Sequence, residues 1–454
     1  MKIIRQIDVF EKSSDYIFDE IEIKNFDLDA VKLLIDNATD DLLLYDGYKI
    51  EGELRSYFEK IGYQFLPDKY DYFLCCYQDN NFPESKQTMK KNIESIFKSH
   101  LEPKEVYKGG KNIPLSDKKI YKLSSNENPL GASPKAVVAM KAALEHIDIY
   151  PDQTDIRLRE ALVKDFDGKL SADQFLCGNS GSEIIDILLR AFINEGDEVI
   201  YSNPCFLPYS VFSRWYGAKT IDIPLLSPNY DLDVEGILNA ITERTKVIFL
   251  TSPNNPTGTY IPKSVLDDFL ERVPKNILIV FDEVYRHFAD AEDYVTGLPY
   301  VLAGHNVLGL NSFSKTYGLA GQRIGYAYTT ATIANYIRLI QKPFLLPLTS
   351  IEAGIGALND SEFIEKTVQT VLDGRTYLAH EFDNIGIKYW PSQANFFIID
   401  PPLPEMEFTD RMMEEGIMVR PVSQFGAPGK VRITIGDHEA NEACVKSIRK
   451  ITGV

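Results

Sequence analysis

The most informative segment of this chain is Ser312-Phe313-Ser314-Lys315-Thr316-Tyr317-Gly318-Leu319-Ala320-Gly321-Gln322-Arg323. A single lysine is usually a solvated surface charge, but Lys315 follows two serines and precedes a turn of small residues that ends in Arg323. Small residues let the backbone pass close to a ligand, and an arginine offers a planar, permanently charged fork to a phosphate. A capped loop would account for Ser312 alone, so the whole segment favours a ligand site around Lys315.

A second informative segment lies upstream, where the apolar run 277–281 predicts a buried strand that ends at Asp282-Glu283-Val284-Tyr285. A carboxylate in that position is poorly solvated unless it has a partner, and Tyr285 reaches the same point if the chain turns there. A lysine that forms a Schiff base with pyridoxal phosphate (PLP) needs an acid for the pyridinium nitrogen, a hydrogen bond for the ring hydroxyl and cations for the phosphate. Asp282, Tyr285 and Arg323 fit these roles in turn, so we predict that Lys315 binds PLP as a cofactor.

Further loops that follow predicted strands add candidate cofactor ligands. Asn255 lies in the rigid turn 251–258 and is predicted to give the ring hydroxyl a second hydrogen bond. The loop 177–183 leads into a helix whose N-terminal N–H groups suit a phosphate, and Phe206 in the segment 203–209 suits stacking on the ring. The predicted catalytic residues are Lys315, Asp282 and Tyr285. The other cofactor-binding residues predicted from these loops are Gly181, Ser182, Phe206, Asn255, Ser312, Ser314 and Arg323.

The composition restricts the class of protein. The formal net charge of −18 argues against nucleic acid or an anionic membrane surface as the main partner. The five cysteines are scattered, without disulfide or metal-ligand spacing, so we expect a reducing compartment and no metal site. The N-terminus gains acidic residues at once, unlike a signal peptide, and no apolar run approaches the roughly 20 residues of a membrane span. We therefore expect a cytoplasmic protein.

The order of apolar runs predicts an α/β protein with a mostly parallel central sheet, a smaller C-terminal α+β domain and a small α+β domain at the N-terminus. The predicted segments are an N-terminal domain (1–101), a linker (102–118), a large domain (119–332) and a C-terminal domain (333–454). In the N-terminal domain we predict strands over 3–10, 16–23 and 70–77 and helices over 29–35, 51–58 and 85–100. In the large domain we predict strands over 199–201, 220–223, 247–250, 277–281, 307–310 and 324–328. In the C-terminal domain we predict strands over 388–390, 395–399, 417–419 and 431–435.

Several motifs occur in the same order as in a known family. They are Ser125-Asn126-Glu127-Asn128-Pro129-Leu130-Gly131, Tyr150-Pro151-Asp152, 254–258, 282–285, Ser314-Lys315, Ser392-Gln393-Ala394-Asn395-Phe396 and Arg432-Ile433-Thr434-Ile435-Gly436. From Ile120 to the C-terminus the chain resembles the fold-type I PLP enzymes of aminotransferase class I and II, most closely the histidinol-phosphate aminotransferases. The segment before Ile120 has no counterpart in this resemblance. The loop 179–183 exchanges Gly and Ser relative to the usual order, and we expect its backbone donors to be retained.

The resemblance implies a transaminase that moves an amino group between an amino acid or amino phosphate and a 2-oxo acid. Lys315 would form the internal aldimine with PLP and carry the proton between the substrate Cα and the cofactor C4′. Arg432 would bind the substrate α-carboxylate as a bidentate pair, assisted by Asn395, and Arg420 would contact a phosphate of the substrate. The substrate-binding residues implied by the resemblance are Asn126, Asn395, Arg420 and Arg432.

The resemblance also implies a homodimer. Tyr150 would cross the dimer interface to the partner's cofactor phosphate, which adds it to the cofactor-binding residues. Because the motifs do not report which bond at the substrate Cα is broken, a PLP-dependent decarboxylase of a phosphorylated amino acid, such as threonine phosphate, is an alternative. A PLP-sensing regulator with a fused DNA-binding domain is a weaker one, since residues 1–100 hold 13 Lys and Arg against 20 Asp and Glu (13 − 20 = −7) and begin with strands.

Overall fold

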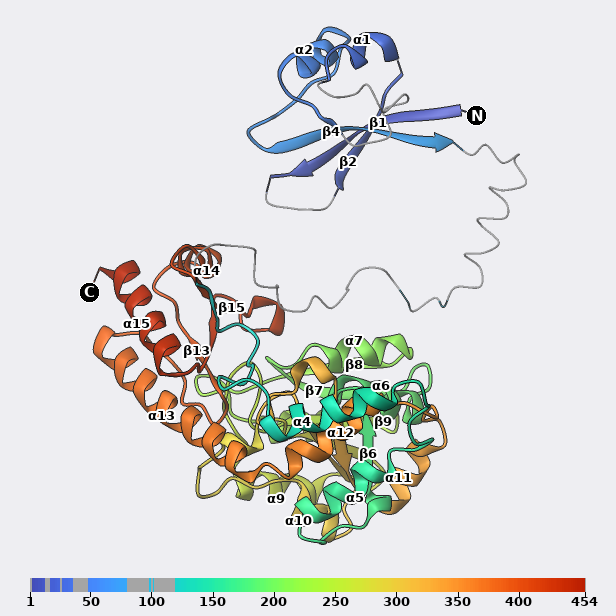
Figure 1. Cartoon of the computed structure of the whole chain (residues 1–454), viewed down its shortest axis with the longest axis vertical. Helices are drawn as coiled ribbons and strands as arrows, with labels where there is room; N and C mark the ends of the chain where they lie inside the picture. The colour runs from blue at the N-terminus through green and yellow to red at the C-terminus, as the bar shows by residue number, and fades with distance from the viewer. Residues whose placement is uncertain are drawn as a thin grey trace. The chain divides into compact units, whose positions relative to one another are not determined.

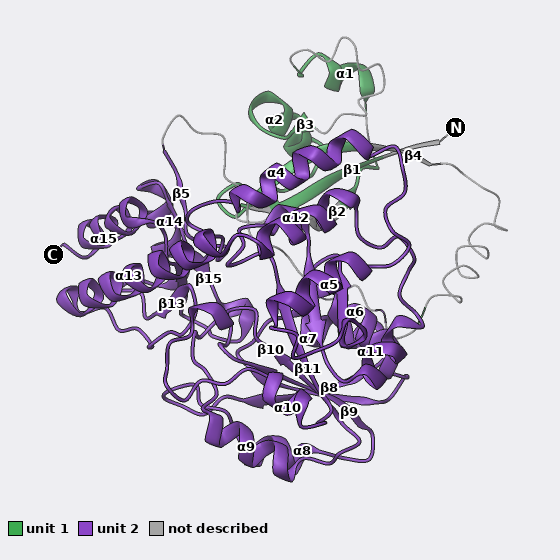
Figure 2. Cartoon of the chain, turned by 60° about the horizontal axis from the view of Figure 1, so that its bottom comes forward, with its two compact units in different colours: residues 1–98 green, residues 99–454 purple. Residues whose placement is uncertain are grey.

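The structure, a computed structural model, describes residues 2–12, 17–24, 27–35, 48–79, 98, 101 and 119–453. The described residues fall into two compact units, Met1–Lys98 and Ser99–Val454 (Figure 2). The predicted linker 102–118 and nearly all of the predicted helix 85–100 lie outside the described residues. No helix in the described ranges is both long enough and apolar enough to cross a membrane.

The first unit is a small antiparallel sheet with two short helices, in the strand order β2-β1-β4-β3 (Figure 1). Ile7 and Val9 alternate along β1 and are buried, together with Leu54 and Phe58, which lie four residues apart on α2. The strands predicted here are confirmed, and the structure adds the short β3. The elements are β1 (Lys2–Glu11), β2 (Ile17–Glu22), α1 (Leu28–Lys32), β3 (Tyr48–Lys49), α2 (Gly52–Lys60) and β4 (Tyr70–Asp79).

The second unit contains the predicted central sheet, in the order β6-β12-β11-β10-β9-β7-β8. Neighbouring strands from β11 to β8 are parallel, and β12 runs antiparallel to β11 and β6. The mostly parallel sheet is thus confirmed. The strands are β6 (Phe175–Gly178), β7 (Glu198–Asn203), β8 (Lys219–Pro224), β9 (Thr245–Thr251), β10 (Leu278–Asp282), β11 (Val307–Ser312) and β12 (Gly325–Tyr328).

Helices cover both faces of this sheet (Figure 1), which explains why its central strands are apolar throughout. Successive side chains of a strand point to opposite faces. Along β10, Ile279 and Phe281 therefore join the core under one helical layer, and Leu278 and Val280 join the core under the other. The first layer contains α4 (Pro134–Ala143), α5 (Ile156–Asp165), α8 (Val234–Ala240), α9 (Lys263–Arg272), α10 (Leu298–Leu302) and α12 (Leu348–Leu358). The second contains α6 (Gly181–Phe192), α7 (Pro208–Trp215) and α11 (Ala331–Arg338).

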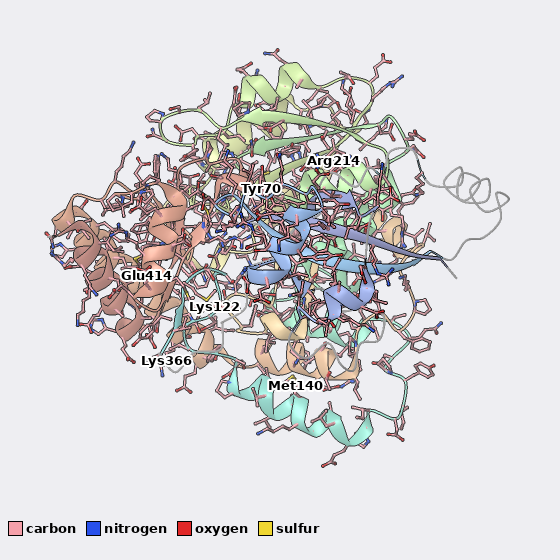
Figure 3. The ribbon with its side chains drawn as sticks, turned by 90° about the horizontal axis from the view of Figure 1, so that it is seen from above. Tyr70, Lys122, Met140, Arg214, Lys366 and Glu414 are labelled. Carbon is pink, nitrogen blue, oxygen red and sulfur yellow. The ribbon has the colours of Figure 1, made fainter. Side chains whose placement is uncertain are left out.

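The C-terminal region is a smaller α+β layer, as predicted, and it includes a strand from the start of the second unit. The predicted strand 388–390 is wrong, because only Tyr389 forms an isolated bridge, to Ile399. The short β5 (Tyr121–Lys122) pairs in parallel with β14 rather than with the central sheet. Figure 3 shows the labelled side chains of Lys122 on β5 and Glu414 at the end of α14 in the same part of the molecule. The other elements are α13 (Ser361–Ile385), β13 (Phe396–Ile399), α14 (Glu405–Glu414), β14 (Ile417–Met418), β15 (Arg420–Pro421), β16 (Val431–Thr434) and α15 (His438–Thr452).

Candidate active site

A cavity of about 460 Å³ lies at the carboxyl ends of β6, β9, β10 and β11. This is the edge at which parallel α/β sheets place their ligands. All of the residues predicted from the sequence for the site line this cavity except Tyr150 and Asn395. The predicted residues that line it are Asn126, Gly181, Ser182, Phe206, Asn255, Asp282, Tyr285, Ser312, Ser314, Lys315, Arg323, Arg420 and Arg432.

Lys315 lies in the loop that follows β11, and its Nζ donates a hydrogen bond of 3.1 Å to the backbone oxygen of Ser125. Burial lowers the pKa of the Lys315 amine from 10.5 to about 7, and the nearby positive charge of Arg432 acts in the same direction. A large share of the amine is therefore neutral near pH 7. A neutral amine is the form that acts as a nucleophile and as a base.

Asp282 ends β10 and is 6% exposed. Its Oδ2 accepts a hydrogen bond of 2.5 Å from the Tyr209 hydroxyl, and its Oδ1 accepts one of 3.2 Å from the Val284 N–H. Burial raises the pKa of the Asp282 carboxyl from 3.8 to about 6, while the bond from Tyr209 works against that rise. A cation placed in the cavity beside Asp282 would offset the cost of burying the carboxylate.

Tyr209 is a site residue that the sequence analysis missed. Its ring stacks on Phe249 at 4.5 Å between centroids, and its hydroxyl also lies 3.0 Å from the Thr251 hydroxyl. Tyr209 belongs to the segment 203–209, in which the sequence predicts only Phe206 as a cofactor ligand. Phe206 lines the cavity and packs edge-on against Tyr209 at 5.7 Å.

The loop between β6 and α6 forms the end of the cavity predicted for the phosphate. Ser180 accepts a hydrogen bond from the Glu183 N–H and so caps α6, whose first residues Gly181 and Ser182 line the cavity. Ser180 has φ 93° and ψ 162°, a region of backbone space used almost only by glycine. Gly325 on β12 approaches this loop so closely that a Cβ there would lie 2.3 Å from the Gly181 nitrogen.

The loop from β11 to β12 also lines the cavity, and it carries the other residues predicted to bind the phosphate. The Ser312 hydroxyl accepts a hydrogen bond of 3.0 Å from the Ser314 N–H, which turns the chain toward Lys315. Arg323 lines the cavity from a left-handed backbone position, φ 53°, and its Nη1 donates to the backbone oxygen of Ala320 at 2.9 Å. The permanent charge of Arg323 and the N-terminus of α6, which also attracts anions, therefore line the same cavity.

The arginines of β15 and β16 line the cavity as well. Arg432 is buried, and its Nη2 and Nη1 donate to the Ser124 backbone oxygen at 2.9 Å and to Asn255 Oδ1 at 2.5 Å. Arg420 is paired directly opposite Arg432 in the antiparallel ladder, and its guanidinium lies 5.4 Å from the centre of the Phe425 ring. Two arginines thus line the same wall of the cavity.

Asn126 lines the cavity and contacts Tyr285, and Asn395 contacts the backbone of Asn126. The Asn126 side-chain amide donates to the Tyr285 hydroxyl at 3.0 Å, and Asn395 Nδ2 donates to the Asn126 backbone oxygen at 3.2 Å. Asn395 is fully buried, and its Oδ1 has no hydrogen-bond partner in the described part of the chain. Thr434, which the sequence analysis quoted but did not select, holds Asn126 in place.

Tyr150 lies away from the cavity of its own chain. Its side chain is 81% exposed, and its ring packs against Phe344 at 5.0 Å between centroids. Ile147 and Ile149 beside it are exposed as well. Within the described ranges, no group of three or more His, Cys, Asp or Glu side chains is arranged to hold a metal ion.

The chemistry of the cavity residues fits PLP. A buried carboxylate at Asp282 suits a protonated ring nitrogen, a partly neutral amine at Lys315 suits attachment to an aldehyde, and Arg323 with the N-terminus of α6 suits a phosphate. The three groups come from separate strand ends that open into one cavity. A cofactor with ring nitrogen, aldehyde and phosphate could therefore contact all of them at once.

Comparison with known proteins gives an independent result. The family model for aminotransferase class I and II matches residues 118–448, and a domain of unknown function (DUF7683) matches residues 4–75. Histidinol-phosphate aminotransferase from Moorella thermoacetica is 36% identical over 379 residues, which is 82% of this chain and 96% of that protein. The enzyme of the same name from Akkermansia muciniphila is 36% identical over 367 residues, 79% of this chain and 99% of that protein.

A solved structure shares the fold of the second unit. The crystal structure of histidinol-phosphate aminotransferase from Sinorhizobium meliloti, in complex with pyridoxal-5'-phosphate, matches with a TM-score of 0.65 and 23% identity, over 74% of this chain and 92% of that one. The fold-type I architecture expected from the sequence is thereby confirmed. The chain belongs to the PLP-dependent aminotransferases of class I and II, and it carries an additional N-terminal domain.

Proposed function

We propose that this aminotransferase takes its amino group from histidinol phosphate or a closely similar phosphorylated amine and passes it to a 2-oxo acid. The observation that carries the proposal is the placement of Arg420 directly opposite Arg432 on adjacent strands, with both residues lining the cavity. Like charges directly opposite each other in a sheet are destabilising. An anionic ligand between them would remove that repulsion, so the wall suits a substrate with a phosphate or carboxylate. The 36% identity to histidinol-phosphate aminotransferases supports the same substrate class.

Lys315 is proposed as the catalytic base and acid. PLP, when bound, supplies an electron-withdrawing ring that stabilises negative charge at the substrate Cα. The Lys315 amine would then take the proton from the substrate Cα and return it at the cofactor C4′. Its pKa of about 7 lies near neutral pH, and general acid–base catalysis is most efficient when the pKa of the catalytic group is close to the pH of the reaction.

The other residues of the cavity are proposed to hold the cofactor and to set its electronic character. Asp282 would keep the ring nitrogen protonated, and Tyr285 with Asn255 would hydrogen-bond the ring hydroxyl. Phe206 would stack on the ring. Gly181, Ser182, Ser312, Ser314 and Arg323 would surround the phosphate.

The assembly and location are also proposed. Because Tyr150 is exposed and lies outside the cavity of its own chain, it is available to enter the cavity of a second copy, in a homodimer. The exposed Ile147 and Ile149 beside it would be buried in such an interface. We place the protein in the cytoplasm, on the grounds of its scattered cysteines and acidic composition.

The proposal is tested by titrating the PLP-loaded protein with a panel of amines while recording its absorption spectrum. We expect histidinol phosphate, and then glutamate, to convert the bound cofactor to its amine form. Arg420→Ala should raise the KM for phosphorylated donors about 10- to 100-fold, because a charge-assisted contact is lost. Arg411→Ala, which removes an exposed arginine of α14, is the matched control and should leave KM unchanged.

Two outcomes would contradict the proposal. Release of carbon dioxide without formation of the amine form would indicate a decarboxylase. If Arg420→Ala raised the KM for phosphorylated and unphosphorylated donors equally, Arg420 would not be the residue that binds the substrate phosphate.

A further inference from the structure

Asn126 is held by the protein through all of its polar groups. Its backbone N–H donates to the Thr434 hydroxyl at 2.9 Å, and its Oδ1 accepts from the same hydroxyl at 3.1 Å. Its backbone oxygen accepts from Asn395 Nδ2 at 3.2 Å. The one remaining polar group, the side-chain Nδ2, donates to the Tyr285 hydroxyl at 3.0 Å. Asn126 and Thr434 are 1% and 2% exposed, so these contacts are shielded from water.

The backbone of Asn126 is consistent with a fixed role for its side chain. Its φ of 54° lies in the left-handed region, which costs most residues energy and which asparagine tolerates better than most. Such conformations persist where the surrounding structure determines them, and they cluster at functional sites. Here the surrounding contacts come from β16 and from the segment that precedes β13.

We propose that Asn126, oriented by Thr434, is a positioning residue that sets the direction of the Tyr285 hydroxyl. An amide N–H can only donate, so the hydrogen of the Tyr285 phenol cannot point at Asn126. Asn126 and Tyr285 both line the cavity. The arrangement leaves the phenol hydrogen available to the ring oxygen that bound PLP would present, and it would make the phenol a stronger donor, because hydrogen bonds in a chain polarise one another.

This role differs from the substrate binding that the resemblance implies for Asn126, and it replaces that assignment. The contact between Arg432 and this segment goes to the backbone oxygen of Ser124 and does not use the Asn126 side chain. Removing the Asn126 side chain therefore leaves Arg432 in place. We expect the removal to change the binding of the cofactor rather than the binding of the substrate. The inference rests on the proposed function, because it takes Tyr285 as the ligand of the ring hydroxyl.

The test compares variants of the full-length protein by PLP affinity and by the circular dichroism that the bound cofactor acquires from its fixed orientation. Asn126→Gly removes the side chain and keeps φ 54° accessible, whereas Asn126→Ala would add backbone strain. We expect Asn126→Gly to weaken PLP binding about fivefold, the worth of one hydrogen bond, and to change the circular dichroism signal. The KM for the amino donor should stay within about twofold, since the arginine contacts are unchanged.

Thr434 supplies a matched pair and a second route if Asn126→Gly folds poorly. Thr434→Val removes the hydroxyl at nearly constant shape and should reproduce the weaker binding, while Thr434→Ser keeps the hydroxyl and should behave like the wild type. The decisive comparison is a double-mutant cycle with Tyr285→Phe. In the Tyr285→Phe background, Asn126→Gly should cause no further loss of affinity and no further change in circular dichroism.

The outcomes separate this inference from the proposed function. If Asn126→Gly still lowered PLP affinity fivefold in the Tyr285→Phe background, Asn126 would not act through the phenol, and the inference would be overturned. Unchanged PLP affinity and circular dichroism with a raised KM would also overturn it, in favour of direct substrate binding. Both results require a wild type that binds PLP. A wild type that binds none would overturn the proposed function itself, and this inference with it.

Discussion

The Tyr209 hydroxyl donates a hydrogen bond of 2.5 Å to Asp282 Oδ2, which joins the start of α7 to the end of β10 beneath the cavity. The bond stabilises the charged form of a carboxylate whose pKa is raised to about 6 by burial. Tyr209 is itself fully buried, and its hydroxyl also contacts Thr251. The charged form of Asp282, the residue proposed to partner the ring nitrogen, is therefore favoured by a neighbour on another element.

Removing the Tyr209 hydroxyl should raise the pKa of Asp282 above about 6, because the bond that favours the carboxylate is lost. PLP is expected to bind best to the ionised carboxylate, so its affinity should fall as the pH drops through this pKa. In Tyr209→Phe we expect that fall to occur at higher pH, which is measured as the PLP dissociation constant between pH 5 and 8. Tyr216→Phe breaks a similar bond to Asp186 outside the cavity and should leave the profile unchanged. An unshifted profile in Tyr209→Phe would contradict the role of this bond.

The buried amine of Lys315 should make the PLP-free protein less stable at low pH than at high pH. Because its pKa is lowered to about 7, the unfolded chain holds a proton that the native chain lacks between about pH 7 and 10.5, so this group makes stability rise with pH across that window. Lys315→Met removes the effect. Urea unfolding should show Lys315→Met more stable than the wild type at pH 6, with a difference that shrinks toward pH 10.

Lys366, an exposed lysine on α13 labelled in Figure 3, provides the control for this measurement. Lys366→Met should change stability by less than about 0.5 kcal/mol at either pH, as is usual for surface substitutions. If Lys315→Met and Lys366→Met show the same pH dependence, the lowered pKa of Lys315 is wrong.

Ser180 has two opposing effects on the stability of the protein. Its strained backbone is destabilising, and the cap that its side chain gives to α6 is stabilising. Its φ 93° and ψ 162° cost on the order of 1–3 kcal/mol for a non-glycine residue, whereas replacing a serine cap by glycine costs only a few tenths. We therefore expect Ser180→Gly to raise the free energy of unfolding of the PLP-free protein by about 1 kcal/mol. Ser180→Ala keeps the strain and loses the cap, so it should be destabilising. A glycine variant no more stable than the alanine variant would show that the strain is absent.

Gly318 should tolerate no side chain. It has φ 67°, and a Cβ there would lie 1.8 Å from the backbone oxygen of Gly131. Gly318→Ala should lower the free energy of unfolding by about 2 kcal/mol or more and displace the loop that carries Lys315. Gly321, three residues on, has open space around its Cβ position and no positive φ, so Gly321→Ala should be nearly neutral in stability. Equal effects of the two substitutions would contradict this close approach.

Tyr150 should act on the partner's cavity if the proposed dimer is correct. Tyr150→Phe and Lys315→Ala are each expected to lose most activity alone. When the two variants are mixed and allowed to exchange subunits, half of the dimers are mixed and each has one intact cavity, so about a quarter of the wild-type activity should return. No recovery after subunit exchange, checked by mass of tagged dimers, would show that Tyr150 does not act on the partner's cavity.

Most of the residues that line the cavity could be predicted from the sequence because the features involved are local. The apolar runs 277–281 and 307–310 identify two buried strands, and the carboxyl ends of parallel strands meet at one edge of the sheet. Asp282 and Ser312 must therefore lie close together, and Lys315 follows within three residues. The position of the loop before α6 at the cavity could be predicted for a similar reason, since a helix N-terminus after a strand carries its own donors.

The contacts between these residues were decided only by the tertiary structure. Tyr209 and Asp282 are 73 residues apart, Asn126 and Tyr285 are 159 apart, and Asn126 and Thr434 are 308 apart. No periodicity or turn signal reports which distant segments pack together, and the pairing of β5 with β14 was missed for the same reason. Local sequence determined which groups surround the cavity, because strand and helix ends are encoded locally. Packing between distant segments determined how those groups are charged and oriented, because burial and hydrogen-bond partners exist only once the chain is folded.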